Sequence, residues 1–421
     1  MPKLPALSTE RRGGVPPGRA TVLHLAQPVE GGVARVVADL AAAQVRAGWS
    51  VVVACPAGGV LEREASAAGA RTARWRAVRE PGMRVAAEVY GVRRLMGEVR
   101  PDLVHAHSAK AGLAARLALR GRVPTVHQPH AWSFEAAAGR TARLARSWER
   151  YAARWADRVL CVSEAERETG TAAGVTARWA VVRNGVDLTR FTPAAPGPHP
   201  GEARAAARAR LAALREVPHR TPLIVCVGRL CRQKGQRTLL AAWPRIAARV
   251  PGARLVLVGD GPDRERLRRA APGGVLFAGA CARVRDWYLA ADLVVLPSLW
   301  EGMALTPLEA MACDRPVVVT DVDGSRELLP PGQEATCLVP PADARALADA
   351  VTRLALDAAL RTASARAAGE HVRARFDVRD TAAAVLELYA TVLGERSAAV
   401  PAPLPSSGPS ADGTPARAEA R

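Results

Sequence analysis

Short apolar runs alternate with segments of helical spacing along most of the chain, and this alternation limits the fold more than any other feature. The run TVLHLA (21–26) precedes GGVARVVADLAAAQVRAG (31–48), whose valines and leucine recur on one side of a helix, and VVVACP (51–56) follows. Strands that alternate with helices indicate a parallel sheet in an α/β domain. The first half continues with runs at DLVHAHS (102–108), PTVHQPH (124–130), RVLCVS (158–163) and WAVVRNG (179–185).

A stretch of prolines, glycines and small residues at 193–210 interrupts this pattern and marks a linker. A second series follows, with apolar runs at LIVCVG (223–228), RLVLVGDG (254–261), VLFAG (275–279), DLVVLPS (292–298), PVVVTD (316–321) and ATCLVP (335–340). Continuously apolar runs are typical of strands that helices cover on both faces. The sequence therefore predicts an α/β protein of two doubly wound, Rossmann-like domains that face each other across a ligand-binding cleft.

Arginine supplies almost all of the positive charge. The formal net charge of the 421-residue chain is +19, and the lysines among its 59 basic residues are Lys3, Lys110 and Lys234. Such a charge can reflect binding to nucleic acid or to a membrane surface, but codon bias in a GC-rich genome also produces an arginine excess, and we favour that origin. Aromatic residues make up only 4% of the chain and form no platform with basic residues, which argues against a nucleic-acid-binding protein.

Cysteine usage and apolar run length indicate the compartment. The seven cysteines are odd in number and include no C-x-x-C pair, which favours free thiols in a reducing compartment. The N-terminal segment lacks the apolar region of a secretory signal, and no run of about 18 apolar residues is available to span a bilayer. We therefore expect a cytoplasmic protein, for which membrane contact is an alternative that we do not favour.

The segment EGMALTPLE (301–309) is the strongest local signal. Pro307 suits the first turn of a helix, so we expect Glu309 within that turn and Glu301 in the loop before it. Free N–H groups at a helix start can hold phosphate, and Gly302 lets a ligand approach the backbone. A carboxylate can accept two hydrogen bonds from the hydroxyls of a ribose or hexose. A surface loop before a capped helix is the alternative reading.

Basic residues cluster in VGRLCRQKGQRTLL (227–240), after the first strand of the second series. Arg229, Arg232 and Lys234 precede a predicted helix there. A chain that uses arginine almost everywhere indicates a chemical reason for lysine at this position. An ammonium and a guanidinium together can neutralise a leaving diphosphate, whereas the alternative is a solvated basic turn.

Two glycine turns follow strands. Gly31 and Gly32 lie between the first strand and the first helix and can bring the backbone close to phosphate, but they lack the G-x-G-x-x-G pattern of dinucleotide binding. GDGP (259–262) lacks the third glycine as well, and we expect it to make a turn.

Four histidines lie at the ends of two neighbouring predicted strands: His105, His107, His127 and His130. H-x-H together with H-x-x-H can form a metal site. Residues i and i+3 do not share a face of a strand, however, and we expect no further His or Cys nearby to complete a set. We therefore expect no metal site, and we favour His130 as a single cleft histidine that hydrogen-bonds a sugar.

The segment at 144–160 combines an apolar and a basic stripe. The apolar stripe consists of Leu144, Trp148, Tyr151, Trp155 and Val159. A basic amphipathic helix can bind an anionic membrane, but we favour a helix that packs on its sheet and leaves its arginines in solvent.

Taken together, these segments resemble the retaining glycosyltransferases of the GT-B fold that form glycosyltransferase family four. The resemblance covers about 21–394. It rests on GGVARVV (31–37), PDLVHAHSAKAG (101–112), HAWSF (130–134), CVSEAER (161–167), NGVD (184–187), VGRLCRQKG (227–235), VGDGP (258–262) and SLWEGMALTPLEAMA (298–312).

The resemblance implies roles for the matching residues. Arg229 and Lys234 would hold the donor diphosphate, Glu309 would bind the ribose, and Glu301 would contact the donor sugar. His130 would support the positive charge that develops on the transferred sugar. The implied catalytic residues are His130, Arg229, Lys234 and Glu301. The implied donor-binding residues are Gly31, Gly32, Arg229, Lys234, Phe277, Gly279, Glu301, Gly302, Met303, Ala304 and Glu309.

The expected mechanism follows from charge. Cleavage of the sugar–phosphate bond places negative charge on the diphosphate, and Arg229, Lys234 and the helix start near Pro307 are suited to stabilise it. We expect no metal-binding D-x-D pair at the end of a strand, so these groups would replace a divalent ion and no cofactor would be needed. The resemblance implies transfer with retention of anomeric configuration.

The resemblance also implies what each part of the chain does. We expect a disordered tail at 1–19, an acceptor-side domain at 20–192, a linker with the first helix of the second half at 193–219, and a nucleotide-sugar donor domain at 220–378. A C-terminal helix at 379–395 would cross back to the first domain, and a second disordered tail would occupy 396–421.

Substrates are the least constrained part of the prediction. The resemblance implies a hexosyltransferase that uses a UDP-sugar, with UDP-N-acetylglucosamine favoured over UDP-glucose. The chain is similar to actinomycete members that glycosylate aminocyclitols such as 2-deoxystreptamine in aminoglycoside antibiotic biosynthesis. A lipid-linked acceptor for cell-envelope polysaccharide, reached through 144–160, is the main alternative. A phosphorylase, an epimerase and a nucleic-acid-binding protein are more distant ones.

Overall fold

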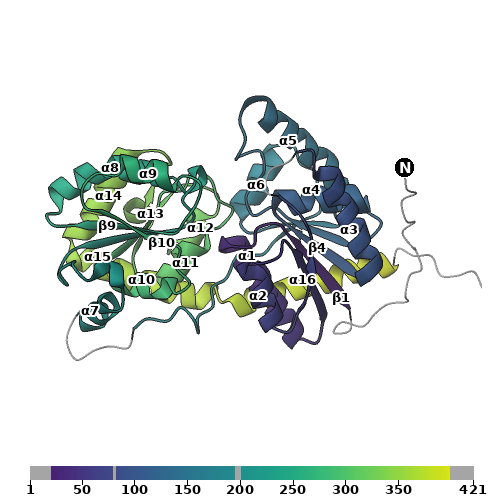
Figure 1. Cartoon of the computed structure of the whole chain (residues 1–421), viewed down its shortest axis with the longest axis horizontal. Coiled ribbons are helices and arrows are strands. Elements are labelled where there is room, and N and C mark those ends of the chain that lie inside the picture. The colour runs from purple at the N-terminus through teal and green to yellow at the C-terminus, as the bar shows by residue number, and fades with distance from the viewer. Residues whose placement is uncertain (1–19, 79–81, 195–200, 399–421) are drawn as a thin grey trace, which may run out of the picture.

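The computed structural model describes residues 20–78, 82–194 and 201–398, which form two α/β domains side by side (Figure 1). The N-terminal sheet has seven parallel strands in the order β3-β2-β1-β4-β5-β6-β7, and the C-terminal sheet has six in the order β10-β9-β8-β11-β12-β13. The prediction of two doubly wound domains is confirmed.

The strands of the first domain are β1 (Thr21–Ala26), β2 (Ser50–Cys55), β3 (Arg71–Arg74), β4 (Leu103–His107), β5 (Thr125–Gln128), β6 (Arg158–Cys161) and β7 (Trp179–Val181). Its helices are α1 (Gly31–Arg46), α2 (Val60–Ala67), α3 (Val85–Val99), α4 (Ser108–Leu119), α5 (Gly139–Ala152), the short 3-10 helix η1 (Ala153–Trp155) and α6 (Glu164–Ala172).

The strands of the second domain are β8 (Leu223–Val227), β9 (Arg254–Val258), β10 (Val275–Gly279), β11 (Leu293–Leu296), β12 (Val317–Thr320) and β13 (Leu338–Val339). The remaining helices are α7 (Glu202–Ala209), η2 (Ala212–Leu214), η3 (Arg232–Lys234), α8 (Gln236–Arg249), α9 (Arg264–Ala270), α10 (Val284–Ala290), α11 (Leu305–Ala312), α12 (Ser325–Leu328), α13 (Glu334–Cys337), α14 (Ala344–Leu356), α15 (Ala358–Arg375) and α16 (Val378–Ala398).

The strand order reverses once in each sheet, and these reversals position the site. β1 pairs with both β2 and β4, and β8 pairs with both β9 and β11. Every residue of β4 and β8 is buried, because helices cover both faces of each sheet. The loops that leave β1, β4, β8 and β11 therefore come together at the carboxyl edges, where ligands of such folds bind.

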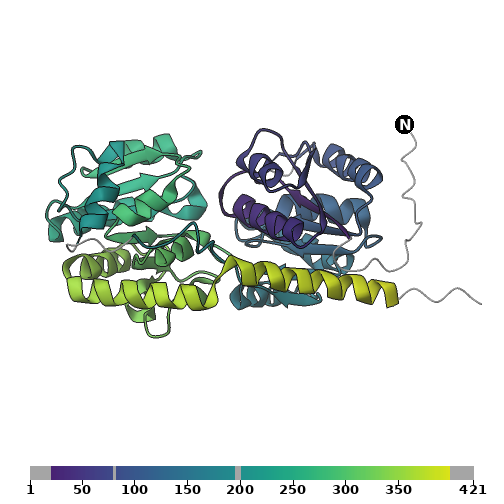
Figure 2. The ribbon, with the colours of Figure 1, turned by 90° about the horizontal axis from the view of Figure 1, so that it is seen from below.

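The chain passes between the domains at two adjacent places. Val186 N–H donates to Phe376 O at 2.8 Å, and Val378 N–H donates to Val186 O at 3.1 Å, so the two crossings form a short parallel bridge. Gly185 is needed there, because a Cβ on it would lie 2.6 Å from the Cα of Val378. α15 and α16 then run in succession beneath the two domains (Figure 2).

Helix α16 packs on the first domain along α1. Tyr389 is fully buried, with its ring 5.7 Å from that of Trp49 and its hydroxyl 2.5 Å from His105 Nδ1. Near its end, Arg396 pairs with Asp157 at 2.5 Å. This ion pair ties the last turn to the first domain, and the helix extends to Ala398, beyond the predicted start of the disordered tail at 396. The rest of that tail and the tail at 1–19 lie outside the described residues.

Two further predictions of secondary structure need correction. The run ATCLVP (335–340) contains the predicted strand only at Leu338–Val339, which form β13, because its first residues belong to α13. The segment 144–160 is not one helix, because α5 ends at Ala152 and Val159 lies in β6.

Helix α5 is also rotated relative to our expectation, with Trp148 of the predicted apolar stripe half-buried and other members of the stripe exposed. It buries Ala142, Glu149 and Ala152, while Leu144 is 71% exposed and Tyr151 is 48% exposed. Arg116 on α4 binds the buried Glu149 at 2.8 Å, and this ion pair fixes the rotation of α5. Among the described residues, no helix combines the length and apolar character needed to cross a membrane.

Candidate active site between the domains

Two loops of the second domain are joined where its strand order reverses. Leu299 N–H donates to Gln233 O at 2.7 Å, which links the loop after β11 to the loop after β8. Gly235 has a φ of +63°, and a Cβ on it would collide with Pro297 O. Only glycine therefore allows the two loops to approach this closely.

The predicted residues Lys234 and Glu301 meet directly across these loops. Lys234 Nζ lies 2.5 Å from Glu301 Oε1, and the Ser298 hydroxyl donates to the same oxygen at 2.6 Å. Glu301 is only 7% exposed. The carboxylate therefore holds the ammonium in place.

Arg229 begins the same loop and is exposed. Its backbone oxygen accepts a hydrogen bond from Gln236 Nε2 at 2.9 Å, which fixes the backbone and leaves the guanidinium in solvent. Arg232 is directed elsewhere, with its guanidinium 5.5 Å from the ring of Trp300. Arg229 and Lys234 are thus the two cations of this loop that remain for an anionic ligand.

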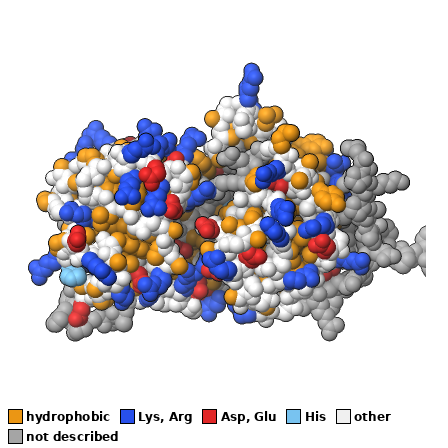
Figure 3. Space-filling view, viewed as in Figure 1, with side chains coloured by type: hydrophobic (Ala, Val, Ile, Leu, Met, Phe, Trp, Pro, Cys, Tyr) orange, Lys and Arg blue, Asp and Glu red, His pale blue; other side chains and the backbone are white. Residues whose placement is uncertain are grey.

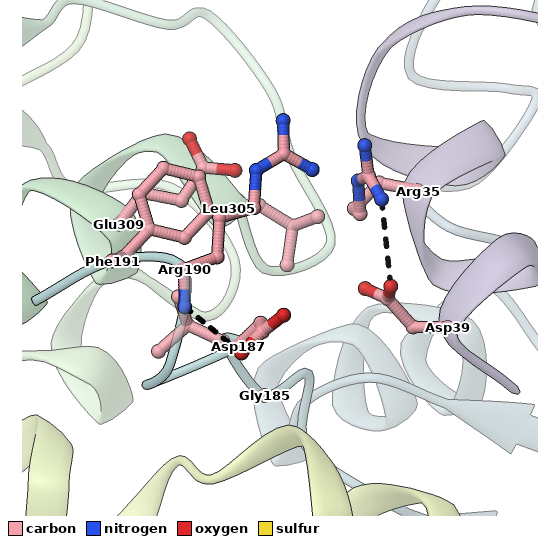
Figure 4. Close-up of a pocket in the computed structure, with 9 residues that line it drawn as sticks. Arg35, Asp39, Gly185, Asp187, Arg190, Phe191, Leu305 and Glu309 are labelled. Atoms are coloured by element: carbon pink, nitrogen blue, oxygen red, sulfur yellow. Dashed lines mark hydrogen bonds and ion pairs between the residues drawn. The ribbon is translucent and has the colours of Figure 1, made fainter. Parts of the chain in front are cut away.

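Glu309 lies on α11 and faces a pocket between the domains (Figure 4). Tyr288 O–H donates to its Oε2 at 2.6 Å. Burial raises the pKa of Glu309, whereas the Tyr288 hydrogen bond and the charges of Arg190 and Arg35 lower it. Helix α11 begins at Leu305, so Glu309 follows the first turn instead of lying within it.

The other walls of this pocket come from residues that sequence reasoning missed. Arg35 and Asp39 project from α1, with 3.6 Å between Arg35 Nη1 and Asp39 Oδ1 (Figure 4). Burial raises the pKa of Asp39 to about 6. Asp187 accepts the Arg190 N–H at 3.1 Å just after the first domain crossing. No local sequence pattern predicts a role for Arg35, Asp39 or Asp187, because only the passage of the chain between the domains brings them opposite Glu309.

The start of α1 faces the start of α11. Gly31 has a φ of +79°, and a Cβ on Gly32 would lie 3.9 Å from Leu305 Cδ1. Glu30 precedes the helix without a side-chain cap, so the first backbone N–H groups of α1 lack a capping side chain. The two predicted glycines therefore border the cleft at a helix end that favours anions.

His130 sits in a strained loop after β5. His130 and Ala131 have φ values of 55° and 87°, which non-glycine residues rarely adopt. Glu166 holds the loop by accepting Ala131 N–H at 2.6 Å, and Glu135 accepts Trp132 N–H at 2.8 Å. Burial raises the pKa of Glu166 to about 7 and that of Glu135 to about 8. Sequence reasoning gave neither glutamate a role, although Glu166 lies within the quoted segment 161–167.

Gly302 brings this loop against the second domain. A Cβ on Gly302 would lie 2.8 Å from Glu166 Oε1 and 2.9 Å from Ala131 N. Asn184 Nδ2 donates to the oxygen of the buried Met303 at 2.7 Å, and Ala304 is buried beside it. The structure therefore brings the predicted His130 and 301–304 segments together from opposite domains.

Phe277 and Gly279 lie on β10, the edge strand of the second sheet. Gly259 N–H donates to Gly279 O at 2.8 Å, and a Cβ on Gly259 would collide with Gly228 O. The end of β10 is thereby connected to the start of the Arg229 loop. The donor-binding role of Phe277 and Gly279 stays a prediction.

We expected no further histidine near His105 and His107, and this expectation is wrong. His24 on β1 is in register with His105 on β4, and His24, His105 and His107 place ring nitrogens within 4.8 Å of one another. The spacing of the histidines within 105–130 could not reveal this, because His24 lies on another strand, 81 residues before His105. His127 lies apart from them, 3.8 Å from Glu149.

The expectation that no D-x-D pair follows a strand is also wrong. Asp321 and Asp323 come directly after β12. Asp321 forms an ion pair with Arg326, and burial raises the pKa of Asp323. Within residues 20–78, 82–194 and 201–398, the histidine group is the only one with three converging candidate ligand atoms, so no third ligand joins this pair.

Comparison with known proteins agrees with this geometry. Residues 30–190 match the family described as Glycosyltransferase Family 4, and residues 221–357 match Glycosyl transferases group 1. The chain is 32% identical over 318 residues to TuaC of Bacillus subtilis, which is named as a teichuronic acid biosynthesis glycosyltransferase; the match covers 74% of this chain and 76% of TuaC. The protein is a family 4 glycosyltransferase.

Solved structures show the same GT-B fold for this glycosyltransferase. HepE of Anabaena, in complex with UDP and glucose, is 23% identical with a TM-score of 0.73, covering 89% of this chain and all of that one. The sucrose-phosphate synthase of Thermosynechococcus elongatus is 24% identical with a TM-score of 0.73, covering 90% of this chain and all of that one. An Escherichia coli galactosyltransferase named for a diphosphoundecaprenol substrate is 29% identical, covering 56% of this chain and 62% of that one.

Proposed function

We propose that this glycosyltransferase moves a hexose or N-acetylhexosamine from a UDP-sugar to a hydroxyl of a small acceptor, with retention of anomeric configuration. The observation that carries the proposal is the Lys234–Glu301 pair beside Arg229 at the interdomain cleft. Lys234 and Arg229 hold the diphosphate, Glu309 accepts hydrogen bonds from the ribose, and Glu301 contacts the sugar. HepE, which shares the fold, was solved with UDP-glucose, and this supports the choice of nucleotide.

The cations act mainly on the leaving group. As the bond between the anomeric carbon and the phosphate oxygen breaks, negative charge grows on the diphosphate, where Lys234 and Arg229 are already in place. The acceptor hydroxyl attacks from the same face, and its proton passes to the leaving phosphate oxygen. His130 stabilises the positive charge on the sugar, and no step requires a metal ion.

Carboxylates on the acceptor side favour a cationic acceptor. Desolvation and the charges of Asp323, Glu166 and Glu301 together raise the pKa of Glu135 to about 8, against the Trp132 N–H that lowers it. An ammonium group of the acceptor would relieve this repulsion. This supports an aminocyclitol such as 2-deoxystreptamine, and our best candidate for the donor is UDP-N-acetylglucosamine in antibiotic biosynthesis.

A lipid-linked acceptor is the second candidate, supported by the exposed face of α5. Leu144 and Tyr151 project from a helix whose Arg140, Arg143 and Arg150 are also exposed. Apolar side chains framed by arginines suit the surface of an anionic membrane. Basic side chains elsewhere on the face in Figure 3 are scattered over both domains and not gathered in one stripe, which offers no track for nucleic acid.

A matrix of donors and acceptors separates the two candidates. The enzyme is incubated with UDP-N-acetylglucosamine, UDP-glucose or GDP-mannose and with 2-deoxystreptamine or a polyprenyl diphosphate sugar, and products are identified by mass spectrometry. We expect one N-acetylhexosamine to be added to 2-deoxystreptamine, with the donor's anomeric configuration visible by NMR. Transfer to the polyprenyl acceptor alone, with sedimentation on phosphatidylglycerol vesicles that Leu144→Asp abolishes, would establish the second candidate.

A further inference from the structure

A series of hydrogen bonds leads from the buried Gln44 on helix α1 to the half-buried His130. Gln44 Oε1 lies 2.7 Å from His24 Nε2, His24 Nδ1 lies 2.9 Å from His107 Nε2, and His107 Nδ1 lies 3.1 Å from His130 Nε2. Gln44, His24 and His107 are fully buried. Each residue comes from a different segment, namely α1, β1, the end of β4 and the loop after β5.

Burial and mutual proximity disfavour a positive charge on these rings: His24 and His107 are fully buried, and the His107 ring stacks against those of His24 and His130 at 5.2 and 5.4 Å between centroids. A neutral imidazole carries one N–H and one lone pair on its two nitrogens. Each ring that is bonded on both sides must therefore donate on one side and accept on the other, so all bonds of the series run in one direction.

Gln44 determines that direction. Its carbonyl oxygen faces His24, so His24 donates from Nε2 and must accept at Nδ1 from His107, which in turn accepts at Nδ1 from His130. The amide nitrogen of Gln44 faces the Tyr389 hydroxyl at 3.5 Å, and that hydroxyl lies 2.5 Å from His105 Nδ1.

We propose that Gln44, His24 and His107 are positioning residues that hold His130 in the tautomer protonated at Nε2, with its lone pair at Nδ1. The inference rests on the proposed role of His130 at the transferred sugar. Three rings bonded in one direction align their dipoles and polarise one another. The lone pair of His130 is the negative end of these aligned dipoles, and it stabilises the positive charge that develops on the sugar. A carboxylate in its place could trap the sugar.

Gln44→Leu tests the proposal, because it removes the oxygen that sets the direction of the hydrogen bonds. Gln44 is also the end of the series that is farthest from His130. Tyr389→Phe is the matched control, since it removes a hydroxyl of the same buried cluster but no bond between Gln44 and His130. We expect Gln44→Leu to lower kcat by about tenfold, the scale of losing a group that orients a functional histidine, with the KM for the UDP-sugar unchanged. Tyr389→Phe should keep most of kcat.

The tautomer itself is read without any turnover. The full-length chain, labelled with 15N-histidine and free of substrate, has eight histidines, and the His130 signals are those lost in His130→Gln. We expect protonation of His130 at Nε2 in the wild type and a mixture of tautomers in Gln44→Leu. If Gln44→Leu does not fold, Gln44→Glu is used, whose oxygens only accept when ionised and should keep the wild-type tautomer.

The outcomes separate this inference from the proposed function. A wild-type His130 protonated at Nδ1, or a stoichiometric metal ion on the histidines of the purified protein, would overturn the inference whatever the activity. A changed tautomer in Gln44→Leu with unchanged kcat would overturn the positioning role. Absence of transfer from every donor, with the expected tautomers present, would instead count against the proposed function.

Discussion

Lys234 forms an ion pair with Glu301, and in the proposed reaction it must also face the leaving diphosphate. We expect Lys234→Ala to lower kcat/KM by about a hundredfold or more, as removal of a preorganised transition-state donor does. Steady-state assay of the UDP-sugar reaction checks this. Arg245→Ala is the control, because it removes an exposed cation from α8 whose partner is the surface residue Asp349. Near-normal rates in Lys234→Ala would contradict the assignment.

Glu166 gives the protein a pH dependence of stability. Burial raises its pKa from 4.5 to about 7, against the two backbone N–H groups that lower it. The folded protein therefore holds this proton more tightly than the unfolded chain, and its contribution to stability is lost as the pH rises from about 4.5 to about 7.

Urea unfolding of the wild type and of Glu166→Gln at a series of pH values checks this prediction. The wild type should lose up to about 3 kcal/mol relative to the variant between pH 4.5 and pH 7, with a constant difference above that range. Parallel curves for the two proteins would show that Glu166 has an ordinary pKa.

At the scale of elements, the buried Arg116–Glu149 pair decides which face of α5 meets solvent. Glu149→Ala would leave Arg116 charged and unpaired in the core, and we expect it to lower the free energy of unfolding by about 3–5 kcal/mol. Arg116→Met with Glu149→Met should recover most of this loss, because no buried charge remains. Denaturant titration measures both, and equal loss in the double variant would argue against the ion pair as the cause.

Elements defined by local periodicity were predictable, and those defined by a distant partner were not. The runs at 21–26 and 223–228 consist mostly of apolar residues, so β1 and β8 follow from the residues themselves. The rotation of α5 depends on Arg116, which lies on another helix, and the position of His24 depends on the register between β1 and β4.

The residues of the candidate site also fall into those that local sequence predicts and those that depend on a distant partner. Lys234 and Glu301 could be found because each lies in a local motif that the resemblance matches. Arg35 and Asp39 could not, because α1 carries no sign of the residues that the domain crossing places opposite it. Glu166 acts through backbone N–H groups of another loop, which no sequence pattern displays.

At the scale of the whole molecule, stability depends on how closely the two crossings approach. A Cβ on Gly185 would lie 2.6 Å from the Cα of Val378, so Gly185→Ala must push the crossings apart, and we expect it to lower the free energy of unfolding by about 1–3 kcal/mol. Gly394→Ala in α16 meets no atom within 4 Å and should raise it by up to about 1 kcal/mol. Thermal and denaturant unfolding of both variants compare the two sites, and equal stability would refute the crowding.

The bridge between Val186 and Asp377 has a kinematic consequence. Two tethers that are hydrogen-bonded to each other act as one pivot, so the domains can rotate about it but cannot slide past each other without breaking the bridge. Such a swing would separate Gly302 from Glu166. Escape of the spent nucleotide would then be one rotational event, whose speed depends on the few residues at the pivot and not on the chemistry of the sugar.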